Sequence, residues 1–144
     1  MGSAITNGTT VSIVNTPQAG DDLFTATGLT EDNLDTLGPV ILDVMGNDLG
    51  GKAKTLYSLD DGTNSLTDLL TKDIVGAENF SANNATIWIT SNGRVAYDAA
   101  TLSAAFKNQL SALTDGQYLE DTFTYAIKLG NGTLSWATAT VRIY

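Results

Sequence analysis

Hydrophobic and polar positions alternate through the C-terminal part of the chain in two runs, which are separated by a glycine-rich segment. In the first run, Phe123, Tyr125 and Ile127 alternate with small or polar residues, and this period of two is typical of a strand with one buried face. The second run follows Gly130-Asn131-Gly132, a segment that tolerates the positive φ angles of a tight turn. The pattern therefore predicts a β-hairpin whose alternate side chains enter a core.

The same kind of pattern predicts further strands upstream. Residues 86–90 and 94–97 flank an Asn92-Gly93 turn, which indicates a second hairpin. Apolar and β-branched runs bounded by glycine, asparagine or proline predict three more strands, at residues 22–27, 39–45 and 53–59. Together with the C-terminal hairpin these make about seven strands, which favours a mainly β fold, a two-sheet sandwich with Greek-key connections.

Two segments show helical periodicity and predict two short helical inserts in this sandwich. In residues 64–75 the apolar positions fall near helical spacing; they are Leu66, Leu69, Leu70 and Ile74. The second helix is expected after Asp98, which is placed to cap it, and should close at Asp115-Gly116. Its apolar stripe, predicted to be core, comprises Leu102, Phe106, Leu110 and Leu113.

The sequence is expected to form a single domain over residues 15–144, because its length and its 42% hydrophobic content suffice for one core. Residues 1–14 are interpreted as a leader or linker, in which Val11–Val14 could form a short edge strand that ends before Pro17. No apolar run approaches the roughly 18 residues of a transmembrane helix, so no membrane span is predicted.

Composition restricts the function more sharply than it restricts the fold. The chain has no cysteine and no histidine, which removes thiolate nucleophiles, disulfides, imidazole acid–base chemistry and the usual zinc ligands. We therefore expect a protein that is not an enzyme. A net charge of −9 disfavours binding to nucleic acid or anionic lipid, and suits a protein that collects hard cations or must stay soluble.

Three stretches then carry a resemblance to a known family. Residues 15–22 contain Pro-Gln-Ala-Gly-Asp-Asp, residues 40–48 read Val-Ile-Leu-Asp-Val-Met-Gly-Asn-Asp, and residues 93–132 join a short strand, a helix, Asp-Thr-Phe-Thr-Tyr and an Asn-Gly turn. In this order and spacing they resemble the VCBS-repeat and cadherin-like (bacterial Ig-like) domains of RTX-type bacterial surface adhesins. The resemblance covers most of residues 15–144 and implies an Ig/cadherin-like Greek-key sandwich.

The resemblance also implies a setting and a cofactor. It implies an extracellular domain on the bacterial surface, with neighbouring repeats of the same parent protein as partners and calcium ions that stiffen the domains or their joints. In isolation we expect a monomer. The sequence departs from the family pattern in two places, since lysines at 52 and 54 follow Asn47-Asp48, and Lys128-Leu129 precede the hairpin turn where Ser-Asp is common. Both changes remove oxygen ligands.

Two acidic groups are candidate cation sites. In an antiparallel sandwich the start of the first firm strand and the end of the second should share a pole, which would bring together Asp21, Asp22, Asn47 and Asp48 as calcium ligands. The alternative is that the aspartates cap a strand and Asn-Asp forms an ordinary Asx-turn. At the opposite pole the residues that could meet are Glu31, Asp32, Asp115, Glu120 and Asp121, either around shared ions or as a solvated acidic end.

Two further functions remain open from the sequence. Trp88 and Trp136 could form part of a sugar-stacking platform for surface glycans, or for a peptide, if they point outward, whereas a reversed phase would place them in the core. The other function is polymerisation by strand donation, in which Val11–Val14 would complete a neighbour's sheet.

Overall fold

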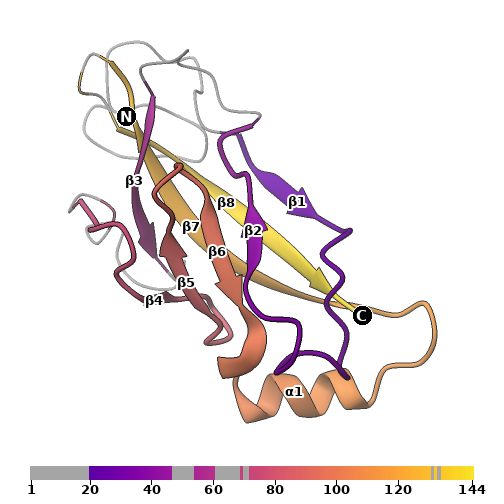
Figure 1. The fold of residues 1–144 in the computed structure, drawn as a ribbon. Coiled ribbons are helices and arrows are strands. Elements are labelled where there is room, and N and C mark those ends of the chain that lie inside the picture. Colours follow the sequence, from indigo (N-terminus) through magenta and orange to yellow (C-terminus); the bar gives the residue numbers. More distant parts are fainter. Residues whose placement is uncertain (1–19, 47–53, 61–68, 70–71, 131, 133) are drawn as a thin grey trace.

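The computed structural model describes residues 20–46, 54–60, 69, 72–130, 132 and 134–144. These residues form two four-stranded sheets that face each other (Figure 1). The first sheet contains, in spatial order, β1 (Asp22–Phe24), β8 (Leu134–Ile143), β7 (Leu119–Lys128) and β3 (Thr55–Asp60). The second sheet contains β2 (Val40–Leu42), β6 (Val95–Asp98), β5 (Thr86–Ile89) and β4 (Asn79–Phe80). The prediction of a mainly β protein with two sheets is confirmed.

The C-terminal hairpin forms the centre of the first sheet. β7 and β8 pair antiparallel along their whole length, from Leu119 opposite Ile143 to Lys128 opposite Leu134. Burial alternates strictly along β8, and its fully buried positions face the core; they are Ser135, Ala137, Ala139, Val141 and Ile143. The predicted hairpin, with alternate side chains in the core, is therefore confirmed.

The second predicted hairpin is also present. β5 and β6 pair antiparallel, and the Thr90 amide donates to the Arg94 carbonyl over 2.8 Å to close the loop between them. Gly93 has a φ of +78°, a conformation that glycine adopts without strain, and this explains the Asn-Gly signal at this turn.

β1 and β2 are both shorter than predicted. β1 pairs parallel with β8 only from Asp22 to Phe24, and beyond it a side chain replaces the ladder, since the Thr27 hydroxyl donates to the Arg142 carbonyl over 2.9 Å. β2 ends at Leu42 because the chain turns at Val44, which is fully buried between the sheets. Past β2 burial continues at Val44, whereas past β1 the side chains of Thr25 and Ala26 are exposed.

The helical inserts differ from the prediction in detail. Asp98 caps only a 3-10 turn, η3 (Ala99–Thr101), while the α-helix α1 (Ala104–Ser111) begins after its own cap, Ser103, whose hydroxyl accepts from the Phe106 amide over 3.2 Å. Most of the helix expected at residues 64–75 lies outside the described residues; Leu69 lies in a 3-10 turn and is fully buried, and residues 72–74 are not helical. β4 was not predicted, because two residues are too few to show a period.

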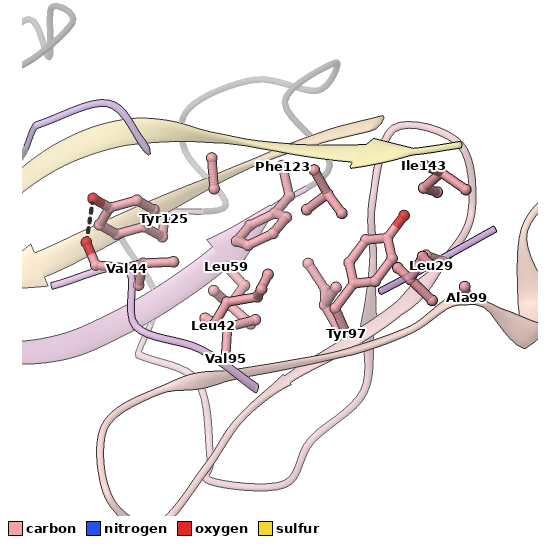
Figure 2. Packing of buried hydrophobic residues seen from close by; sticks show 14 of the residues in the cluster. Leu29, Leu42, Val44, Leu59, Val95, Tyr97, Ala99, Phe123, Tyr125 and Ile143 are labelled. Carbon is pink, nitrogen blue, oxygen red and sulfur yellow. Dashed lines mark hydrogen bonds between the residues drawn. The ribbon is translucent and has the colours of Figure 1, made fainter. Parts of the chain in front are cut away.

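One hydrophobic core fills the space between the sheets (Figure 2). Its largest fully buried side chains include Tyr97 from the second sheet and Phe123 and Tyr125 from the first. Leu102, Phe106 and Leu110 of the predicted apolar stripe are buried in it, and Leu113 packs against it. The insert therefore covers one end of the sandwich. In the described part of the chain no helix is long and apolar enough to cross a membrane.

Candidate functional site

The hydroxyl of Tyr125 marks the pole where the first strand begins and the second has ended. It lies 2.7 Å from the Asp22 carboxylate, 2.8 Å from the Val44 carbonyl oxygen and 2.9 Å from the Gly20 carbonyl oxygen. Figure 2 shows the ring of Tyr125 within the core and its hydroxyl at Val44. Segments before β1 and after β2 are thus joined through one buried side chain of β7.

Asp21 and Asp22 have different surroundings, as expected for neighbours in an extended chain. The Asp21 carboxylate is exposed and accepts from the Thr138 amide of β8 over 2.9 Å. The Asp22 carboxylate is half-buried and reaches the Tyr125 hydroxyl. The other two predicted ligands, Asn47 and Asp48, lie outside the described residues, so the four-residue calcium site stays a prediction.

The oxygen atoms at this pole are of the kinds that calcium takes. A calcium ion binds six to eight oxygens from carboxylates and main-chain carbonyls, at about 2.3–2.6 Å. Gly20, Asp22 and Val44 bring one carboxylate and two carbonyl oxygens close to a single atom. Over the described ranges, no three acidic side chains are grouped to hold a metal, so an ion here would depend on the backbone and on residues 47 and 48.

The acidic group at the opposite pole differs from the prediction. Asp121 does not belong to it, because this side chain is fully buried between β7 and the second sheet. Glu120 points outward and pairs with Arg142, with 2.9 Å between Oε2 and Nε. The three remaining acidic residues, Glu31, Asp32 and Asp115, line one pocket of about 200 Å³ next to Tyr144. The predicted five-residue cluster therefore reduces to three.

The Asp121 carboxylate is surrounded by hydrogen-bond donors. It accepts from the hydroxyls of Ser81 and Tyr97, the latter over 2.6 Å, and from the amide of Thr122 over 2.9 Å. Asn83 adds its backbone amide over 3.0 Å and its side-chain amide over 2.9 Å. Five donors compensate for the burial of this charge, and they tie the loop after β4, strand β6 and strand β7 together.

The environment of Asp121 also changes the pKa of Tyr97. Burial raises the pKa of Tyr97 far above its usual value, and the negative charge of Asp121 and the hydrogen bond to it raise that pKa further, while Ser81 lowers it. The phenol therefore stays protonated and keeps donating to Asp121 at all ordinary pH values.

The sequence contained a signal for Asp121 that the prediction missed. Asp121 is in phase with Phe123 and Tyr125, and this alternation places it on the buried face of β7. The acidic-pole prediction places Asp121 before the strand, whereas β7 already begins at Leu119. Its donors could not be foreseen, because Ser81 and Asn83 lie before β5, about 40 residues away from Asp121 in the sequence.

The tryptophans point outward but are only half exposed. Trp88 lies opposite Ala96 and Trp136 opposite Ala126, and both alanines are buried on the outer faces of their sheets. An outward tryptophan that covers its cross-strand alanine needs no ligand to explain it. The indole nitrogen of Trp136 is itself buried, with no acceptor among the described residues.

Among the described residues three aromatic side chains are exposed, Phe80 on β4 and the tyrosines Tyr118 and Tyr144. Tyr118 and Tyr144 are 41% and 39% exposed, and their rings meet edge to face with centroids 5.8 Å apart. The Arg142 guanidinium lies 4.2 Å from the centroid of the Tyr118 ring. Its hydrogen bond to Glu120 raises the pKa of Arg142 above its already high value.

Comparison with protein families and with curated proteins does not assign this chain to a family. No protein-family model matches the chain. No curated protein matches it in sequence either.

Proposed function

We propose that the chain is a structural repeat of a bacterial cell-surface adhesin, folded as an Ig/cadherin-like Greek-key sandwich and not catalytic. The parallel pairing of β1 with β8 carries the proposal. Because the first and last strands run in the same direction, the polypeptide comes into the domain at one end and leaves it at the other. Copies joined in series would form an extended rod, which is what an extender repeat requires.

The strand order supports the Greek-key assignment. β1, β2 and β3 follow one another in the chain but alternate between the two sheets, and β6 and β7 again lie in different sheets. Such crossings between sheets are typical of Greek-key sandwiches.

A tandem of two copies, joined end to end, tests the mechanical proposal. Small-angle X-ray scattering should give a maximum dimension close to twice that of one copy, since each chain passes from one pole to the other. A compact pair, with a maximum dimension close to that of a single copy, would contradict the extender function without affecting the fold.

Calcium at the Tyr125 pole forms the second part of the proposal. The clustered oxygens of Gly20, Asp22 and Val44, with Asp21, Asn47 and Asp48 nearby in the chain, would supply hard ligands of the type that calcium prefers. Bound calcium would fix the strand ends to each other and stiffen the joint with the preceding repeat.

Thermal unfolding with and without calcium tests this part. An ion bound only by the folded chain stabilises it by about 2.7 kcal/mol at a concentration 100 times the Kd, so millimolar calcium should raise the Tm. Asp22→Asn should reduce that rise. Asp35→Asn, which removes the same charge from a side chain that is 76% exposed, should not. A Tm that responds neither to calcium nor to EDTA would contradict the calcium site.

The exposed tyrosine pair favours a second candidate function, carbohydrate or peptide binding. Tyr144 lines a pocket whose floor includes Leu110 and Leu113 and whose other walls are polar, a combination that suits the mixed surface of a sugar ring. A glycan array probed with the wild-type chain and with Tyr144→Ala tests it. Binding should be lost in the variant and kept in Trp88→Ala. An array with no bound glycan would count against this function.

A further inference from the structure

An apolar groove opens between the outermost strands of the two sheets. β1 ends the first sheet and β2 ends the second, and on this side of the molecule the sheets are not joined by a shared strand (Figure 1). The groove has a volume of about 310 Å³. Its lining consists of Leu23, Phe24, Thr25, Ala26, Thr27, Val40, Ile41 and Leu42.

The lining of this groove is unusual for so acidic a protein. It contains no charged side chain, although 16% of the chain is charged. Leu23 and Ile41 are 53% and 52% exposed, so large apolar side chains on both strands meet solvent. Outermost strands also present backbone N–H and C=O groups along their outer edges. The groove therefore matches an extended, uncharged, apolar strand better than it matches a small polar ligand.

The sequence contains one segment with this character beyond the described chain. Residues 1–20 include no Asp, Glu, Lys or Arg. Within them Val11-Ser-Ile-Val14 combines three β-branched apolar residues with a serine, a composition that favours strands. The segment thus resembles the groove in lacking charge, and it has the side chains that an apolar groove would bury.

The described chain begins close to one end of the groove. The Tyr125 hydroxyl lies 2.9 Å from the Gly20 carbonyl oxygen, and the Asp21 carboxylate accepts from the Thr138 amide, so Gly20 and Asp21 are fixed at the pole where β1 begins. Six residue steps separate Val14 from Gly20 and span at most about 22 Å. The pole where the chain arrives is also one end of the groove. Two copies related by a twofold axis could therefore each insert a segment into the other's groove.

We infer that Val11–Val14 of one copy adds as a strand in the β1–β2 groove of a second copy, giving a reciprocal dimer. The inserted strand would bury Leu23 and Ile41 and hydrogen-bond to an outer strand edge. The proposal does not rest on the adhesin or calcium proposals, because it requires only the groove and the donor segment.

Sedimentation velocity over a concentration series tests the association with the full chain. The wild type should shift from one copy of 15.1 kDa towards a dimer as concentration rises. Ile13→Asp in the donor and Ile41→Asp in the groove should each weaken association by about tenfold or more, because a buried unpaired charge is costly. Two variants that add the same charge elsewhere, Ile5→Asp and Ile74→Asp, should associate like the wild type; Ile74 is 78% exposed.

A peptide experiment checks the groove separately from the dimer. A synthetic peptide with the sequence of residues 9–16 should bind to the full-length Ile13→Asp chain, whose groove is intact, and should slow hydrogen exchange at Val40–Leu42. The same peptide carrying Ile13→Asp should not bind. Because Ile41 is unchanged in this chain, the experiment tests binding even if Ile41→Asp fails to fold.

Two results would overturn the inference. The first is a wild-type chain that stays monomeric at millimolar concentration while the peptide also fails to bind. The second is a monomer in which deletion of residues 1–16 speeds exchange at Val40–Leu42, because that result assigns the groove to the chain's own segment.

Discussion

Two polar clusters tie the sheets together, and they are built in opposite ways. At Asp121 a carboxylate lies among five hydrogen-bond donors, one of them the Tyr97 hydroxyl. At the other cluster the Tyr125 hydroxyl lies among three acceptor oxygens, those of Gly20, Asp22 and Val44. A buried carboxylate whose hydrogen bonds are all satisfied by protein donors favours a structural role. A cluster of acceptor oxygens, in contrast, is the kind of group that binds a cation.

The largest expected effect comes from removing the carboxylate of the first cluster. Asp121→Ala should lower the free energy of unfolding by about 3 kcal/mol or more, because several buried donors, including those of Ser81 and Tyr97, lose their acceptor together. Urea denaturation measures this loss. Asp121→Asn should cost less, because its amide keeps one acceptor oxygen. An Asp121→Ala chain as stable as the wild type would contradict the structural role of the cluster.

The two tyrosines compare the clusters directly. Tyr97→Phe removes a hydrogen bond to a buried charge and should lower the free energy of unfolding by about 1.5–3 kcal/mol. Tyr125→Phe removes a hydroxyl from the oxygen-rich pole and should have a similar or smaller effect on stability.

Calcium should distinguish the two tyrosine variants. The calcium-dependent rise in Tm, measured by calorimetry, should persist in Tyr97→Phe and change in Tyr125→Phe, since only Tyr125 lies at the proposed site. If calcium raised the Tm of both variants equally, the proposal that only the Tyr125 cluster binds calcium would be contradicted.

The pH dependence of stability sharpens the description of the Asp121 cluster. In the unfolded chain the pKa of Tyr97 is about 10, and in the folded chain it is raised above this value. The unfolded state therefore loses the Tyr97 proton first as the pH rises. Tyr97 therefore stabilises the fold fully below about pH 10, and the free energy of unfolding should fall by up to about 1.4 kcal/mol per pH unit above it. Urea denaturation at pH 9–11 should show a smaller fall for Tyr97→Phe. The same slope in both chains would contradict this origin.

The smallest effect is expected next to Asp121 in sequence but on the outer face. Glu120→Gln removes the partner of Arg142 at the surface, where ion pairs contribute little because water and salt screen them. Its urea midpoint should change less than that of any variant above. If Glu120→Gln lost as much stability as Asp121→Ala, the difference in burial between the two side chains would not explain their contributions.

Much of the fold was predictable because local patterns and packing agree. The alternation in β7 and β8 and the two Asn-Gly turns predicted both hairpins, since a period of two and a positive φ are local requirements. The candidate site was less accessible. Strand direction predicts that the start of β1 and the end of β2 share a pole. The Tyr125 hydroxyl that joins them there is about 100 residues from Asp22 and about 80 from Val44 in the sequence, so no local pattern indicates it.

The sequence by itself determined that β7 and β8 each have one core face, where the hairpins turn, and that the chain contains no cysteine or histidine. These properties depend on side-chain chemistry and on neighbours within a few residues. Only the tertiary structure decided that Asp121 is a buried hub and not part of an acidic pole, that the tryptophans cover alanines, and that β1 and β2 border an open groove. Each of these depends on which distant segments meet across the sheets, and the free energy of such contacts has no local pattern from which it can be read.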